Sequence, residues 1–342
     1  MDSAQTRIPA RPALIDGHDR RIDYVRLSVT DRCDLRCSYC MPERMQFLPR
    51  REVLSLEEIH RLALEFIARG VRKIRLTGGE PLVRRDIMDL VRAIGREIGS
   101  GGLDELTLTT NGTQLATHAE ALADAGIRRI NVSLDTRDPA LFAQLSRRDA
   151  LDQVMTGLDS AKNAGLAIKI NTVALRGLNE AEIPELIRWA HGEGHELTLI
   201  EVMPLGEVEQ DRIDHYLPLT AIYDQLRAGW TLTASDHNSG GPARYYDIAE
   251  TGGRLGLITP LTQNFCAGCN RVRVTATGQI YMCLGQSDRI DLRAALRGSD
   301  SDAALQAALD MAMRTKPERH SFDISRRGAA PAVSRHMSVT GG

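Results

Sequence analysis

Six short β-rich runs alternate with helical patterns between residues 23 and 203, and this rhythm constrains the fold more than any other feature of the chain. The runs are YVRLSV, RKIRLT, ELTLTT, INVSLD, IKINTV and LTLIEVM. Ser55 and Glu58 form a capping box before one helical pattern, and Gly70 and Gly126 stand where helices should end. Six successive β-α units predict an α/β fold with a parallel sheet covered by helices.

The six runs also alternate apolar and polar residues, and successive side chains of a strand point to opposite faces of a sheet. The residues expected on the apolar face are Val25, Leu27, Val29, Ile74, Leu76, Leu106, Leu108, Ile130, Val132, Leu134, Ile168 and Ile170. Those expected on the polar face are Arg26, Ser28, Lys73, Arg75, Thr107, Thr109, Asn131, Ser133, Asp135, Lys169 and Asn171.

The apolar face must meet the helices, and the other face is too polar for the side-chain-filled interior of a closed barrel. We therefore expect a partial (β/α)6 TIM-type barrel whose concave inside is wet and holds a ligand. Arg26, Arg75 and Lys169 indicate that part of this ligand is anionic. The alternative is an ordinary open sheet with one face in solvent, which parallel sheets rarely tolerate.

The pattern changes after Met203, and SDHNSGGPAR marks a hinge near residue 240. Two further strands (RYYDIA and RLGLIT), a hairpin in FCAGCNRVRVTATGQIYMC and helical patterns from Leu292 and Ala303 follow. We expect this region to be an extension that closes the barrel mouth. The predicted parts are a loose leader over 1–20, the barrel over 21–235 and the C-terminal region over 236–342.

Composition narrows the class of protein. Forty-three basic residues balance 45 acidic ones, which argues against a broad nucleic-acid surface, and no apolar run is long enough to span a bilayer. The six cysteines form two groups of three, a poor basis for disulfides. These features predict a cytoplasmic enzyme that handles metal.

Cys33, Cys37 and Cys40 follow the first strand in a C-x3-C-x2-C spacing, at the end of the strand where β/α barrels place their chemistry. A structural zinc site would take four protein ligands. A cubane iron–sulfur cluster has four irons that each need a ligand, so three cysteines leave one iron open. The spacing therefore favours a cluster with an open coordination site over a purely structural metal loop.

Cys266, Cys269 and Cys283 form a second triplet, C-x2-C-x13-C, again without a fourth cysteine or a nearby histidine. A zinc ribbon is the alternative, but a second cluster with an open iron is favoured. Arg271 and Arg273 follow two residues apart, so on a strand they project from one face beside the thiols. Such a pair suits phosphate binding, with two solvated surface arginines as the plainer interpretation.

CDLRCSYC and the TGGEP loop after the second run (Thr77 to Pro81) resemble the radical S-adenosylmethionine superfamily. The resemblance implies a [4Fe-4S] cluster whose open iron is chelated by S-adenosylmethionine, with one electron releasing a 5′-deoxyadenosyl radical. It also implies the cofactor-binding positions Tyr39, Gly79, Ser133 and Met203. Chemistry alone leaves Met203 equally consistent with an ordinary core methionine.

The second triplet, CNRVRV, TTNG (Thr109 to Gly112) and the terminal Gly-Gly resemble one family of that superfamily, which opens molybdenum cofactor (molybdopterin) biosynthesis. The resemblance implies a lyase that converts GTP to (8S)-3′,8-cyclo-7,8-dihydroguanosine 5′-triphosphate, with guanine on a second [4Fe-4S] cluster. No side chain is needed as an acid or base, because the cofactors carry the chemistry. The implied GTP contacts are Arg26, Arg75, Thr109, Lys169, Arg271, Val272 and Arg273.

The resemblance further implies a homodimer, a reductant as electron donor and a downstream cyclic pyranopterin synthase. Gly341 and Gly342 form the tail that in the family reaches the active site, although Thr340 stands where the family has an apolar residue. Plain terminal disorder is the alternative for these glycines. Two other functions stay open on the residues alone: a peptide-modifying radical enzyme with an auxiliary cluster, and a non-catalytic zinc-binding protein.

Overall fold

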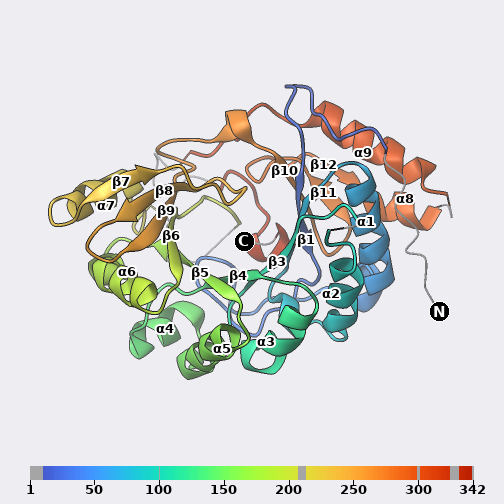
Figure 1. Ribbon diagram of the computed structural model, residues 1–342. Coiled ribbons are helices and arrows are strands. Elements are labelled where there is room, and N and C mark those ends of the chain that lie inside the picture. Colours follow the sequence, from blue (N-terminus) through green and yellow to red (C-terminus); the bar gives the residue numbers. More distant parts are fainter. Residues whose placement is uncertain (1–10, 100, 207–212, 299–300, 324–330, 341–342) are drawn as a thin grey trace.

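The computed structural model describes residues 11–99, 101–206, 213–298, 301–323 and 331–340. The strands of these residues form one curved sheet in the order β12-β11-β10-β1-β2-β3-β4-β5-β6-β9-β8-β7 (Figure 1). Their bounds are β1 Tyr24–Ser28, β2 Lys73–Thr77, β3 Glu105–Thr110, β4 Arg129–Ser133, β5 Ala167–Ala174, β6 Glu196–Glu201, β7 Leu232–Ser235, β8 Arg244–Ile248, β9 Gly253–Ile258, β10 Arg271–Val274, β11 Gln279–Tyr281 and β12 Arg289–Asp291.

The six expected barrel strands are present as β1 to β6 and pair in parallel in sequence order. The C-terminal region lengthens this parallel run at both ends, because β10 pairs with β1 and β9 pairs with β6. Antiparallel strands then flank the run on either side. The predicted partial barrel is confirmed, and its sheet is wider than the sequence indicated; β7 and β12 were not predicted.

Helices cover the outer face of the sheet, except for the short α10, which lies on the inner side (Figure 1). Their bounds are α1 Leu56–Ala68, α2 Ile87–Gly95, α3 Leu115–Asp124, α4 Pro139–Ser146, α5 Leu151–Asn163, α6 Ile183–Gly192, α7 Leu219–Arg227, α8 Leu292–Gly298, α9 Ala303–Thr315 and α10 Met337–Thr340. Among the described helices, none combines the length and apolar character needed to cross a membrane.

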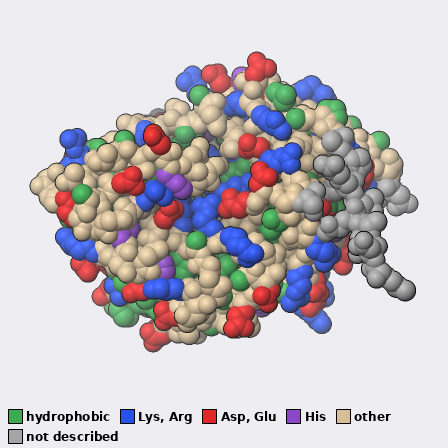
Figure 2. Space-filling view, viewed as in Figure 1, with side chains coloured by type: hydrophobic (Ala, Val, Ile, Leu, Met, Phe, Trp, Pro, Cys, Tyr) green, Lys and Arg blue, Asp and Glu red, His purple; other side chains and the backbone are tan. Residues whose placement is uncertain are grey.

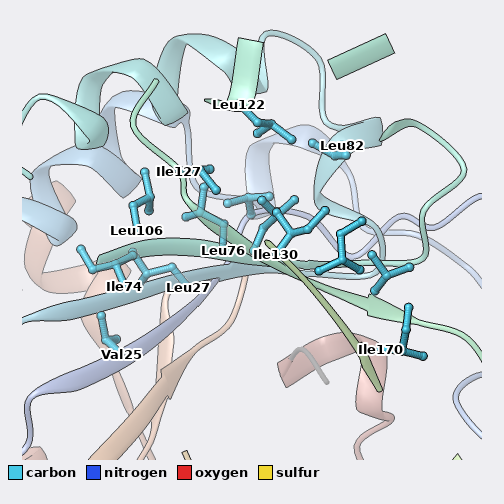
Figure 3. Close-up of a cluster of buried hydrophobic side chains, with 14 of the residues drawn as sticks. Val25, Leu27, Ile74, Leu76, Leu82, Leu106, Leu122, Ile127, Ile130 and Ile170 are labelled. Atoms are coloured by element: carbon cyan, nitrogen blue, oxygen red, sulfur yellow. The ribbon is translucent and has the colours of Figure 1, made fainter. Parts of the chain in front are cut away.

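The core lies between this helical layer and the sheet. Every strand residue predicted on the apolar face is almost completely buried and belongs to one hydrophobic cluster. Figure 3 shows side chains such as Leu76, Leu106 and Ile130 gathered with Leu122 of α3. The apolar face of the barrel strands therefore points outward to the helices, which leaves the polar face for the inside.

The segment 259–270 crosses the opening of the barrel from the end of β9 to the start of β10 (Figure 1). Because β10 runs parallel to β1, its first residue lies beside Tyr24 at the amino end of β1. The backbone N–H of Tyr24 donates to the Asn270 carbonyl at 3.3 Å. The crossing thus carries the second cysteine triplet to the amino end of β1, whereas the first triplet follows its carboxyl end.

Residues 11–20 pack against the body of the protein. Leu14 is fully buried, and Arg20 donates to the carbonyl oxygens of Cys266 at 2.9 Å and Glu318 at 2.7 Å. This part of the expected leader is therefore an ordered part of the fold rather than a loose end, and residues 1–10 lie outside the described residues. The expected boundary after residue 235 falls in the loop of the β7–β8 hairpin and stays a prediction.

Glu201, at the end of β6, joins the barrel to the crossing segment. Its fully buried carboxylate accepts from the backbone N–H groups of Leu219 at 3.2 Å, Leu261 at 3.0 Å and Thr262 at 3.2 Å. It also accepts from the Thr262 hydroxyl at 2.5 Å. One side chain thus satisfies donors from the start of α7 and from the segment that leads to Cys266.

We expect Glu201→Gln to lower the free energy of unfolding by about 2 kcal/mol, because an amide NH2 would face buried donors that lose their acceptor. The measurement is the urea midpoint of anaerobically purified protein. Glu196→Gln, at the other end of the same strand, is the matched control, since its half-exposed pairs with Arg254 and His237 contribute about 1 kcal/mol or less. Equal shifts for the two variants would contradict this account.

Candidate functional site

One large cavity lies on the concave side of the sheet. It has about 2030 Å³ of space free of atoms, its open part included. Basic side chains gather near the middle of the face shown in Figure 2. The predicted site residues that line the cavity are Arg26, Cys33, Cys37, Tyr39, Cys40, Arg75, Gly79, Thr109, Ser133, Lys169, Met203, Cys266, Cys269, Arg271, Val272, Arg273 and Cys283.

These are all the predicted site residues that the structure describes; Gly341 and Gly342 lie outside the described residues. The side chain of Val272 is part of the hydrophobic core, because it alternates with Arg271 and Arg273 along β10. Its contact with the cavity therefore comes from its backbone. The cavity brings together residues that lie as far apart as Arg26 and Cys283 in the sequence.

The first triplet occupies a tight loop beyond the carboxyl end of β1. The backbone N–H of Cys40 donates to the Cys37 carbonyl at 2.9 Å, and the Asn111 amide lies 3.7 Å from the Cys33 sulfur. Burial raises the pKa of Cys33 to about 12 and that of Cys40 to about 11. Thiols in this environment ionise when a metal binds and supplies positive charge.

The TGGEP loop presses directly on the loop of the first triplet. The backbone N–H of Gly79 donates to the Thr30 carbonyl oxygen at 2.9 Å, and that of Glu80 donates to the Arg32 carbonyl oxygen at 2.7 Å. A Cβ on Gly79 would lie 2.3 Å from the Arg32 carbonyl oxygen, far inside van der Waals contact. Glycine is therefore required here for the backbone to close against the residue before Cys33.

Tyr39 is held by a carboxylate that the sequence did not single out as a site residue. Its hydroxyl donates to Asp135 Oδ2 at 2.5 Å, and Asp135 Oδ1 accepts from the Val173 N–H at 2.8 Å. Burial raises the pKa of Asp135 to about 6. The alternation of β4 placed Asp135 on the inner face, but only the fold brings it to Tyr39.

The second triplet differs from the first in its electrostatics. Burial alone would raise the pKa of Cys269, but the charges of Arg271 and Lys316 bring it below its usual value. The Lys316 ammonium lies 3.5 Å from the Cys269 sulfur and donates to the Met282 carbonyl at 2.9 Å. Lys316 directly follows α9 and lies 47 residues after Cys269, so no local pattern in the sequence identified it.

Within the described ranges, no three His, Cys, Asp or Glu side chains are arranged to hold a single metal ion. A four-iron cluster makes a different demand, because each thiolate ligates its own iron. The three thiols of a triplet therefore need to face one cavity rather than one point, and each triplet does so. Cysteine thiols are the usual ligands of such clusters, so the residues present fit the group.

Five basic side chains line the cavity and are at most 9% exposed: Arg26, Arg75, Lys169, Arg271 and Arg273. Burial lowers the pKa of Lys169 to about 7 and that of Arg75 to about 10. Several buried polar atoms on these walls have no hydrogen-bond partner among the described residues: Arg75 Nε, Arg271 Nη1, Arg273 Nη1, Thr109 Oγ1, Asn131 Oδ1 and Asn171 Oδ1. Buried donors without partners are costly, so this wall is arranged for an anionic, hydrogen-bonding ligand.

The last described residues run across the cavity. The Gly206 N–H, in the loop that follows β6, donates to the Val333 carbonyl at 2.9 Å. The Arg335 guanidinium donates to the carbonyl oxygens of Gln286 at 2.7 Å and Cys283 at 3.2 Å. Met337 and Ser338 line the cavity. The tail is thus attached to two walls of the site, one of them the loop of the second triplet.

Comparison with known proteins assigns this architecture to a family. Residues 27–190 match the radical SAM superfamily model, and residues 195–322 match the model described as Molybdenum Cofactor Synthesis C. A GTP 3′,8-cyclase of Erythrobacter litoralis is 68% identical over 97% of this chain and 100% of its own length. The GTP 3′,8-cyclase of Sinorhizobium medicae is 60% identical over 96% of this chain and 95% of its own. The chain belongs to the GTP 3′,8-cyclase family.

Solved structures agree on the fold. SuiB of Streptococcus suis bound to S-adenosylmethionine matches 87% of this chain and 69% of its own with a TM-score of 0.60 at 18% identity. The protein anSMEcpe with bound AdoMet matches 85% of this chain and 82% of its own with a TM-score of 0.57 at 14% identity. At these identities the likeness concerns the fold alone, and the GTP 3′,8-cyclase relatives carry the assignment.

We expect Gly79→Ala to displace the loop of the first triplet, because the new Cβ would meet the Arg32 backbone. Iron content after anaerobic reconstitution should fall by about half, since the second triplet is untouched and each triplet is expected to hold one cluster. Gly192→Ala is the matched control: Gly192 ends α6, and nothing lies within 4 Å of its added Cβ. Full iron content in Gly79→Ala would show that the close approach is dispensable.

Proposed function

We propose that the chain catalyses the radical cyclisation of GTP to (8S)-3′,8-cyclo-7,8-dihydroguanosine 5′-triphosphate, the first step of molybdenum cofactor biosynthesis. The observation that carries the proposal is the arrangement of a single cavity. Its two thiol triplets lie beyond opposite ends of β1, and buried cations of β1, β2 and β10 line the space between them. The assignment to the GTP 3′,8-cyclase family supports the same reaction.

Each triplet would hold one [4Fe-4S] cluster: Cys33, Cys37 and Cys40 at the carboxyl end of β1, and Cys266, Cys269 and Cys283 at its amino end. When bound near the first triplet, S-adenosylmethionine and its cluster supply the carbon radical chemistry by which C3′ of GTP becomes bonded to C8. The residues proposed to bind S-adenosylmethionine are Tyr39, Gly79, Ser133 and Met203. Asp135 would fix Tyr39 through their hydrogen bond.

The triphosphate would lie against the buried cations. Arg26, Arg75, Thr109, Lys169, Arg271, Arg273 and the backbone of Val272 are the proposed contacts. Guanidinium groups whose donors are unpartnered and buried can bind phosphate oxygens without first giving up other bonds. The guanine would then lie toward the second triplet, and no side chain has to act as an acid or base.

The proposed setting follows the family. The reaction needs a reductant as electron donor, and its product would pass to a cyclic pyranopterin synthase. We propose a homodimer located in the cytoplasm.

Anaerobic incubation of the reconstituted protein with GTP, S-adenosylmethionine and dithionite tests the function directly. We expect 5′-deoxyadenosine and a cyclised guanine nucleotide. Arg273→Ala should weaken GTP binding by about tenfold or more, because it removes charge-assisted hydrogen bonds of about 1.5–3 kcal/mol. Arg314→Ala, an exposed arginine of α9, is the control for charge. A peptide-modifying enzyme would not depend on Arg273 for GTP, and absence of both products would refute the proposal.

Removal of Gly341 and Gly342 should strongly reduce product formation while both clusters remain. The proposal is supported by the described part of the tail, since Met337 and Ser338 line the cavity and Ser338 lies beside Cys40. Product yield and iron content are measured on the same preparation. Unchanged yield with full iron content would mean that these glycines take no part in turnover.

A further inference from the structure

Tyr24 is a buried group of the cavity to which the proposed mechanism assigns no role. It lies at the start of β1, is 1% exposed and lines the cavity. Because it stands two residues before Arg26 on the strand, its side chain is on the same inner face. The polar-face pattern read from the sequence began at Arg26, so this phenol was not identified.

Cations surround the Tyr24 ring. Arg26 Cζ lies 5.8 Å, Lys73 Nζ 5.4 Å and Arg75 Cζ 5.6 Å from its centroid. The Arg26 Nε–H also donates to the Tyr24 hydroxyl oxygen at 3.3 Å. Three positive groups from two adjacent strands thus converge on one phenol.

The charges around this phenol are unbalanced. Tyr24 is directly opposite Arg271 of β10 in register, and Arg273 follows on the same face of that strand. Glu105 of β3 is the acidic partner at this end, but it bonds Lys73 and Arg129. Lys169 of β5 adds a further buried amine on the same wall, which is positively charged below about pH 7. Burial raises the pKa of Tyr24, but the charges of Arg26, Arg75 and Lys73 outweigh it and lower the pKa to about 7.

We propose that Tyr24 is the resident counter-ion of the phosphate-binding wall, and that a bound triphosphate displaces its negative charge. In the empty site the phenolate oxygen accepts from Arg26 and compensates the neighbouring cations. A triphosphate brings its own negative charge to those cations, so the phenolate takes up one proton from solvent. The neutral hydroxyl then donates a hydrogen bond to a phosphate oxygen.

This inference rests on the proposed function, because it requires GTP to place its triphosphate on this wall. It also couples binding to proton uptake. The free protein, with Tyr24 as a phenolate, combines with one proton and GTP to give a complex in which the phenol is neutral. Affinity should therefore be highest below pH 7. Above pH 7 the dissociation constant should rise by up to about tenfold per pH unit, since each complex formed must take up a proton.

The test compares the dissociation constant of GTP for the parent protein and Tyr24→Phe, both reconstituted, between pH 6 and pH 8.5. Phe keeps the ring packing and removes only the hydroxyl. At pH 6 the variant should bind about tenfold more weakly, because it lacks a hydrogen bond to a charged group. The variant-to-parent ratio of the dissociation constants should fall by about tenfold or more by pH 8.5, since only the parent must protonate its phenol.

Using a ratio removes groups that titrate in both proteins, Lys169 among them. Tyr246→Phe is the matched control: Tyr246 lies on β8 outside the cavity, packs on Tyr223, and should leave the ratio near one at every pH. Calorimetry at pH 8 in buffers of different ionisation enthalpy should also detect more proton uptake in the parent than in Tyr24→Phe.

The outcomes separate the two proposals. A variant-to-parent ratio that stays constant with pH, while both proteins bind GTP, overturns the role of Tyr24 and leaves the proposed function standing. Failure of the parent to bind GTP at any pH overturns both. Inorganic tripolyphosphate should reproduce the pH-dependent ratio, and guanosine should not; a pH-dependent ratio with guanosine would place the phenol against the nucleoside and overturn the phosphate contact.

Discussion

Positive charge buried on the inner face of the sheet is the constraint on which the site depends. Arg26, Arg75 and Arg273 come from three adjacent strands and are all at most 9% exposed. Taking such charges out of water is unfavourable unless they are paired or hydrogen-bonded. The surrounding protein supplies only part of that compensation. An anion bound in the cavity would supply the rest. A closed barrel filled by apolar side chains would have room neither for these cations nor for a bound anion.

The outer layer makes this inner arrangement possible. The apolar face of each strand is buried against helices, which fixes the register of the sheet and leaves the polar face inside. Single polar residues then secure the parts that the core does not reach. Glu201 holds the crossing segment, Arg20 holds the carbonyl of Cys266, and Arg335 holds the tail against the loop of Cys283. Each acts through backbone groups, so each fixes the position of a cysteine loop.

Local patterns predicted the barrel well because their causes are local. The capping box is present, with Ser55 Oγ accepting from the Glu58 N–H at 3.2 Å and Glu58 Oε2 accepting from the Ser55 N–H at 2.7 Å. The strand faces were confirmed because side-chain alternation is a property of the strand itself. The leader was wrongly expected to be loose over residues 11–20, since Leu14 and Arg20 are held by partners far away in the chain.

The sequence by itself determined the two three-thiol groups, the six β-α units and the side of each strand that carries charge. These depend on spacing and on repeats of two or about 3.6 residues, which neighbouring positions set. Only the tertiary structure decided that the second triplet lies beyond the amino end of β1, that Lys316 approaches Cys269 and that three cations surround Tyr24. Those relations arise when β9 and β10 extend the sheet and the chain crosses between them, and contacts between distant segments leave no local pattern to read.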